Sequence, residues 1–150
     1  MSSTHLSLHY HVVFSTKERH PLIDPEWRER LHAYLGGITR DLGGVPECVG
    51  GVADHVHLLI GLKATHRLCD VIRDIKVSSS KWVHETQALR EFGWQDGYGA
   101  FTVSDSRREA VKHYIRNQEV HHQAQLFEDE YVTFLQKAGV EFDERYLWSD

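Results

Sequence analysis

Two short segments with strictly alternating side chains constrain the fold of this chain more than any other feature. Residues 6–14 place five apolar or aromatic side chains at every second position: Leu6, Leu8, Tyr10, Val12 and Phe14. Residues 54–60 do the same with Val56, Leu58 and Ile60. Because successive side chains of a strand point to opposite faces of a sheet, each segment is predicted to be a strand with one buried face.

The segments between and after these strands have helical or turn character. Asp24-Pro25 opens a helix as cap and first residue, and Gly43-Gly44 stops it after about Leu42. The remaining predicted elements are a strand over 45–53, a helix over 66–90, a strand near 98–103, a helix from 104 to about 122 and a helix over 127–138. The order strand-helix-strand-strand-helix-strand is the split βαβ pattern. We therefore predict an α+β fold with a ferredoxin-like (RRM-like) palm, in which two helices cover one face of an antiparallel sheet of about four strands. The later helix over 104–122 is free to lie on the other face.

Two pairs of polar residues on these elements have the spacing of a reactive site. His55 and His57 project from the same face of their strand, so their imidazoles could share one divalent metal ion. Tyr114 and Gln118 lie one helical turn apart on one helix face. An amide oxygen could complete a metal site, and a phenol beside the metal could act as a nucleophile.

Sequence spacing alone does not single out this histidine pair. His9 and His11 have the same spacing in the first strand, which neighbours the third strand in the predicted topology, so all four histidines could share the open face. The other interpretation of His9 and His11 is a partly exposed strand face with no role in chemistry. Asp54 is expected to point away from His55 and His57 in a regular strand, and we interpret it as structural.

Composition indicates one globular domain over residues 1–150. The chain is 41% hydrophobic and 26% charged, which is ordinary for such a domain. No apolar run approaches the roughly 20 residues of a membrane helix. Cys48 and Cys69 are isolated and lack metal-binding spacing, so a reduced, cytoplasmic chain is expected.

The net charge of −5 opposes a nucleic-acid partner, but the charge is unevenly distributed. The C-terminal acidic helix and tail, about 126–150, hold seven acids and two bases and so carry that entire excess. Residues 63–116 hold ten bases and seven acids, a local +3. A local basic groove can hold a nucleic acid on a protein that is acidic overall.

Several motifs together resemble one enzyme family. His55-Val56-His57 resembles the HUH motif, in which two histidines flank a hydrophobic residue, and Tyr114 with Gln118 resembles the nucleophile helix of single-tyrosine HUH transposases. Residues 10–17 and 94–101 also resemble this family and occur in the same order. The closest branch is the small enzymes of insertion-sequence-200/605 elements, the IS200-like transposases.

This resemblance implies a function and a site. Tyr114 would attack single-stranded DNA near a hairpin, leaving a 5′-phosphotyrosine link and a free 3′-hydroxyl. His55, His57 and Gln118 would hold Mg²⁺ or Mn²⁺, although imidazole ligands alone favour zinc or another first-row metal. The enzyme would be a homodimer in which the tyrosine helix of one chain completes the histidine pair of the other. The resemblance also selects His55 and His57 over the earlier pair.

Basic residues in three regions are the candidate DNA contacts, mostly for holding phosphates. They are Lys17, Arg19, Arg73, Lys76, Lys81, Arg107, Arg108, Lys112 and Arg116. The segment 76–81 resembles the basic, serine-rich helix that meets the DNA hairpin in the family.

Two alternative functions remain open from the sequence. One is a domesticated relative that binds or processes repeated hairpins for its host. The other is a non-catalytic nucleic-acid-binding module on a ferredoxin-like sheet. Such modules usually present aromatic side chains on the two central strands, whereas histidines are expected on the open face here.

Overall fold

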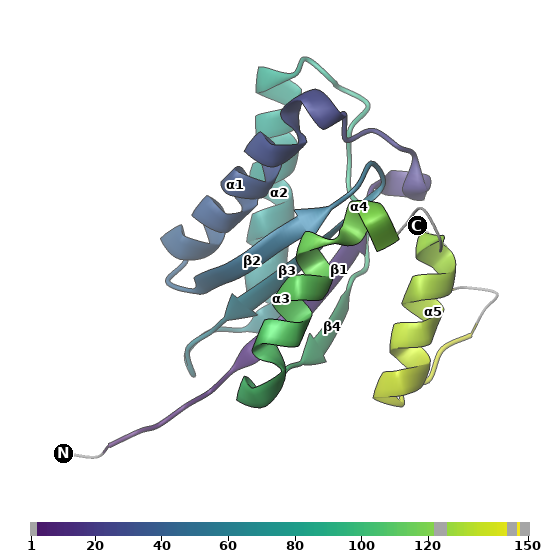
Figure 1. The fold of residues 1–150 in the computed structure, drawn as a ribbon. Coiled ribbons are helices and arrows are strands. Elements are labelled where there is room, and N and C mark those ends of the chain that lie inside the picture. The colour runs from purple at the N-terminus through teal and green to yellow at the C-terminus, as the bar shows by residue number, and fades with distance from the viewer. Residues whose placement is uncertain (1–2, 122–125, 144–146, 148–150) are drawn as a thin grey trace.

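Four antiparallel strands form the sheet at the centre of the computed structural model, which describes residues 3–121, 126–143 and 147. They are β1 (His9–Ser15), β2 (Val45–Gly51), β3 (His55–Gly61) and β4 (Gly99–Thr102), in the order β2-β3-β1-β4 (Figure 1). The two strands predicted from alternation, β1 and β3, are the central pair, and Val13 lies opposite His57 in their register. The predicted α+β, ferredoxin-like fold is confirmed.

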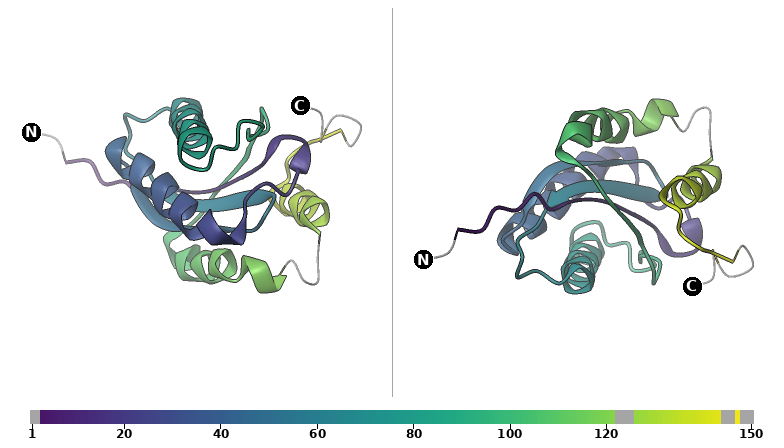
Figure 2. Two further views of the ribbon diagram at one scale, coloured as in Figure 1. Left: turned by 90° about the horizontal axis from the view of Figure 1, so that it is seen from above. Right: turned by 90° about the horizontal axis from the view of Figure 1, so that it is seen from below.

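Helices cover both faces of this sheet. α1 (Pro25–Asp41) and α2 (Leu68–Thr86) lie on one face, while α3 (Arg108–Arg116), α4 (Gln118–His121) and α5 (Phe127–Ala138) lie on the other. Figure 2 shows α2 and α3 on opposite sides of the strands. Two short 3-10 turns, 17–19 and 105–107, complete the regular structure of the described residues.

The face under α1 and α2 holds the main apolar core. Alternate residues of β1 and β3 enter it, and all are fully buried: Val12, Phe14, Val56, Leu58 and Ile60. The α1 helix begins as predicted, because the Asp24 carboxylate accepts a hydrogen bond from the Glu26 backbone N–H at 2.8 Å and Pro25 is the first helical residue. This packing fixes which side of β1 and β3 faces the opposite layer.

Several predicted boundaries differ from the structure. The first strand begins at His9, and Leu6 before it is 54% exposed. The second helix ends at Thr86, after which Ala88 adopts a positive φ of 52°. The predicted end of the third helix at His122 lies outside the described residues.

The predicted single helix carrying Tyr114 and Gln118 is interrupted. Asn117 has a φ of −103° and a ψ of 23°, so α3 ends at Arg116 and Gln118 begins α4. The expected cap, Ser104, makes no capping hydrogen bond through its side chain and precedes a 3-10 turn. By contrast, α5 has the predicted bounds and closes at Gly139, whose φ is 68°.

The structure also bears on membrane crossing and on the state of the cysteines. None of the described helices combines the length and the apolar character that a membrane crossing requires. Cys48 and Cys69 are both free, as expected, with Cys48 buried and Cys69 exposed.

Candidate metal centre and nucleophile

His55 and His57 face the α3–α5 layer and are completely buried. They share β3 with apolar neighbours that point into the other core, so alternation along one strand separates the two environments. Buried polar rings need hydrogen-bond partners, and each imidazole has one on both ring nitrogens.

The surroundings of His55 are those of a cation ligand. Its Nδ1 lies 2.8 Å from Oδ1 of Asp54 and donates to that carboxylate, while its Nε2 lies 3.1 Å from Oε1 of Gln118. The Gln118 amide donates through Nε2 to the Tyr114 carbonyl at 3.3 Å, which directs Oε1 towards His55. In the tautomer whose one N–H is on Nδ1, Nε2 of His55 and Oε1 of Gln118 present lone pairs to the same point. A bound metal ion would resolve this pairing.

Asp54 therefore does not point away from the site as expected. It lies in a bend before β3, where strand alternation does not apply, and its backbone carbonyl accepts from the Thr16 N–H at 2.9 Å. Its carboxylate accepts from Nδ1 and so orients the His55 ring with Nε2 towards Gln118 and Glu130.

His57 connects two buried groups. Its Nε2 lies 3.0 Å from Oε1 of Glu130, and its Nδ1 lies 2.7 Å from Nε2 of His11. The same Glu130 oxygen lies 3.6 Å from Nε2 of His55. The ligand atoms of His55, His57 and Glu130 all lie within 4.8 Å of one another, so the three residues could hold one metal ion.

The earlier histidine pair divides between two environments. His11 is 3% exposed, and burial, with His57 as a second cause, lowers its pKa to about 3, so this ring is neutral. The interpretation of a partly exposed strand face is thus wrong for His11. Its Nε2 contacts Nδ1 of His57, the ring nitrogen that does not face Glu130. His9 instead lies 3.2 Å from the Glu47 carboxylate, at the other end of β1.

Tyr114 projects from α3 into the same cluster. Its hydroxyl donates to Oε2 of Glu130, and its ring meets that of His57 edge-on with centroids 5.7 Å apart. Burial raises the pKa of the Tyr114 phenol, and the hydrogen bond to Glu130 and the negative charge of that residue raise it further. The phenol is therefore protonated as held here, with a carboxylate in place to accept its proton.

Glu130 was not predicted from the sequence. It occupies the buried stripe of α5 at helical spacing from Phe127 and Phe134, and its side chain is 2% exposed. Phe127 stacks on His55 with ring centroids 4.1 Å apart, which seats α5 over the histidines. The signal that could have revealed it is a carboxylate on an otherwise aromatic stripe, because such a group is rarely buried without a partner.

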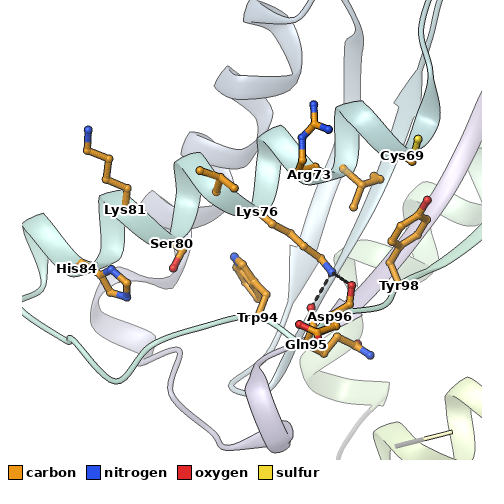
Figure 3. Close-up of a pocket in the computed structure, with 12 residues that line it drawn as sticks. Cys69, Arg73, Lys76, Ser80, Lys81, His84, Trp94, Gln95, Asp96 and Tyr98 are labelled. Carbon is orange, nitrogen blue, oxygen red and sulfur yellow. Dashed lines mark hydrogen bonds between the residues drawn. The ribbon is translucent and has the colours of Figure 1, made fainter. Parts of the chain in front are cut away.

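The candidate DNA contacts lie in separate places, and several of them already contact acidic or carbonyl groups of the protein. Lys76 donates to the carbonyls of Gln95 and Asp96 at 2.8 and 3.2 Å (Figure 3). It also donates to the carbonyl of Gly97 at 2.7 Å. Arg108 is paired with Glu47. These contacts brace a loop and a helix, so neither side chain extends freely into solvent.

Four of the other seven candidates line three separate surface hollows. Arg73 and Lys81 line a groove of about 570 Å³ between α2 and residues 94–98 (Figure 3). Trp94 in this groove is fixed by donating to Ser79 at 2.9 Å. Arg107 lines a cleft of about 380 Å³ beside Tyr114, and Arg116 a hollow of about 360 Å³ beside Gln118. The remaining three lie as follows: Lys17 is exposed in the first 3-10 turn, Arg19 pairs with Glu128 at 2.9 Å, and Lys112 pairs with Glu109 at 3.3 Å.

Comparison with known proteins gives this geometry a family. Residues 4–118 match the model of the family described as "Transposase IS200 like", and the chain belongs to that family. The ISDra2 transposase TnpA of Deinococcus radiodurans is 26% identical over 117 residues, which cover 74% of this chain and 84% of that protein.

Two solved structures share the fold. A crystal structure described as that of a transposase from Deinococcus radiodurans is 26% identical, has a TM-score of 0.61 and matches 79% of this chain and 98% of the other. The REP-associated tyrosine transposase bound to a REP hairpin is 15% identical, has a TM-score of 0.59 and matches 81% and 74% of the two chains, which shows the fold alone. The family match ends at Gln118, so Glu130 and the rest of α5 lie beyond it.

Proposed function

We propose that this protein is a metal-dependent transposase that cleaves and rejoins single-stranded DNA at hairpin-marked ends through a 5′-phosphotyrosine on Tyr114. One observation carries the proposal: the Tyr114 hydroxyl and Nε2 of both His55 and His57 converge on the Glu130 carboxylate in one buried cluster. Membership of the IS200-like family supplies the reaction class, DNA strand transfer.

The metal would be held by His55 and His57 with oxygens from Gln118 and Glu130. Two imidazoles and an amide are neutral, whereas Glu130 adds one negative charge and a hard ligand atom, which suits Mg²⁺ or Mn²⁺ better than the histidines do alone. When bound, such an ion supplies Lewis-acid stabilisation of the phosphodiester oxygens. Asp54 and His11 would orient the two rings through their outer nitrogens.

Tyr114 would then act as the nucleophile. Its hydroxyl oxygen forms a bond to the scissile phosphorus, the bond from phosphorus to the 3′-oxygen breaks, and that oxygen takes up a proton to become a free 3′-hydroxyl. The phenolic proton passes to Oε2 of Glu130, which already accepts its hydrogen bond. The covalent link retains the energy of the phosphodiester, so a 3′-hydroxyl can later reverse the attack and rejoin DNA.

The DNA partner would be a hairpin next to the scissile strand. Arg73 and Lys81 on the α2 groove are suited to phosphates, and Arg107 flanks the Tyr114 cleft. The REP-associated transposase of the same fold is bound to a REP hairpin, which supports this class of partner. A cytoplasmic protein with two free cysteines is consistent with such a role.

The direct test is covalent capture. Wild type and Tyr114→Phe are incubated with single-stranded DNA carrying the flanking element end and Mg²⁺ or Mn²⁺, and the products are separated on a denaturing gel. We expect a metal-dependent protein–DNA adduct for wild type and none for the variant, which lacks the nucleophilic oxygen. Hairpin binding by wild type without any adduct would reject the transferase and favour a hairpin-binding protein.

Whether Tyr114 serves its own chain is a separate question. The resemblance implies a homodimer with sites completed in trans, but Tyr114 reaches Glu130 of its own chain. A mixture of Tyr114→Phe and His57→Ala proteins tests the two arrangements. Recovery of adduct in the mixture supports exchange between subunits, and its absence supports a site built within one chain.

A further inference from the structure

A partly buried ion pair joins the start of α3 to the sheet. Arg108 is the first residue of α3, and its guanidinium contacts both carboxylate oxygens of Glu47 on β2, through Nε at 3.1 Å and through Nη2. The Glu47 side chain is only 7% exposed. A two-point contact of this kind fixes the orientation of both groups as well as their distance.

This pair is part of a wider connection. Nδ1 of His9 on β1 lies 3.2 Å from the same carboxylate, and Asp105 accepts from Arg108 Nη1 at 2.8 Å. Two strands and the turn before α3 therefore meet at Glu47. The cluster lies outside the main apolar core, which is formed under α1 and α2.

The far end of α3 is seated by close backbone packing. A Cβ atom placed on Gly50 of β2 would come within 2.4 Å of the Ile115 carbonyl oxygen, so α3 rests directly on the strand there. The apolar side of α3 is small. Ile115 is buried, and Val111 and Tyr114 are partly buried. These side chains pack on Cys48, Leu59 and Val103. A helix of nine residues with so small an apolar face needs its polar anchor.

We propose that Glu47 and Arg108 are positioning residues that hold α3, and with it the Tyr114 hydroxyl, over the His55–His57 pair. Arg108 thus serves the reaction from within the protein instead of contacting DNA as expected. The inference rests on the proposed function for its catalytic consequence, while the position of Tyr114 can be measured without catalysis.

The test compares Glu47→Gln with Glu109→Gln. Both remove one acid, but Glu109 is exposed on α3, where its carboxylate lies 3.3 Å from Nζ of Lys112. The protein is labelled with 3-fluorotyrosine, and the Tyr114 resonance is assigned by its disappearance in Tyr114→Phe. We expect Glu47→Gln to move this ¹⁹F resonance towards the solvent-exposed position and to slow adduct formation about tenfold or more.

Two further measurements separate positioning from general damage. Metal affinity should fall much less for Glu47→Gln than for His57→Ala, because His55 and His57 are both on the central strand β3, while Gln118 follows α3. Arg108→Lys keeps the charge but loses the two-point contact of the guanidinium with Glu47, so it should move the Tyr114 resonance in the same direction. If Glu47→Gln does not fold, the Tyr114 resonance of Arg108→Lys tests the positioning role instead.

The outcomes are distinct. If Glu47→Gln and Arg108→Lys leave the Tyr114 resonance where Glu109→Gln leaves it, the positioning role is wrong. If wild type forms no adduct, the proposed function fails, yet the resonance still reports whether the ion pair holds Tyr114.

Discussion

The two faces of the sheet are built from the same two strands and have opposite chemistry. Under α1 and α2, alternate residues of β1 and β3 make a continuous apolar core. Under α3, α4 and α5, the intervening residues include His11, His55 and His57, joined by Glu130 from α5. All seven residues of β3 are buried, so burial does not distinguish the faces.

What distinguishes them is how each face is held together. Apolar packing is non-directional, and it tolerates small shifts of α1 and α2. The polar face depends on specific donors and acceptors, since an unpaired buried group costs about 1–3 kcal/mol. The apolar face therefore mainly stabilises the fold, whereas the polar face fixes the relative positions of the residues in the proposed site.

The largest effect is expected from His57→Ala on the polar face. Mutation of a residue that only orients a metal ligand lowers metal affinity by about 10–100-fold. Loss of a ligand itself should therefore weaken Mn²⁺ binding by more than about 100-fold. Isothermal titration calorimetry measures this change. His20→Ala is the matched control, since His20 is an exposed histidine away from the cluster. Equal Mn²⁺ affinities for the two variants would remove His57 from the metal site.

Leu58→Ala should lower the stability of the fold without changing the affinity for Mn²⁺. Leu58 neighbours His57 but is fully buried in the apolar core, so its truncation should lower the free energy of unfolding by roughly 2–5 kcal/mol. Urea denaturation measures that loss, and the folded variant should retain its Mn²⁺ affinity. Val77→Ala on α2 serves as control because Val77 is 63% exposed. A large change in Mn²⁺ affinity for Leu58→Ala would show that the two faces are coupled.

A smaller effect concerns His32 on α1. Burial, followed by the charge of Arg28, lowers its pKa to about 4, whereas the unfolded chain has the ordinary value of 6.5. The unfolded state therefore binds more protons between these values, and stability falls as the pH drops through that window. Between pH 7 and 5, wild type should lose about 2 kcal/mol more than His32→Gln in urea denaturation. Parallel losses in both proteins would show that His32 does not titrate on unfolding.

The sequence predicts the fold well where alternation and caps act locally. The periods of β1 and β3, the Asp24 cap of α1 and Gly139 at the end of α5 all appear as expected. The break at Asn117 was not predicted, because no Gly or Pro marks it. Its effect is to tilt Gln118 so that its amide reaches His55 while Tyr114 reaches Glu130.

The site was predicted only in part. His55, His57, Tyr114 and Gln118 meet because motifs fix their spacing within β3 and across the α3–α4 segment. Glu130 arrives from a helix outside the family match, and nothing local in the sequence says where α5 docks. For Lys76 and Arg108 the DNA contact stays a prediction. The structure adds contacts of both side chains with oxygen atoms of the protein, which the sequence alone does not distinguish from contacts with phosphates.

The central claim is that the polar face is a metal centre, and crystals of the protein saturated with Mn²⁺ test it most directly. Anomalous diffraction should give a peak bonded to Nε2 of His55 and of His57 and to an oxygen of Gln118 or Glu130. His57 would then donate through Nδ1 to His11. A manganese peak elsewhere, with Glu130 still hydrogen-bonded to His57 and Tyr114, would contradict the account.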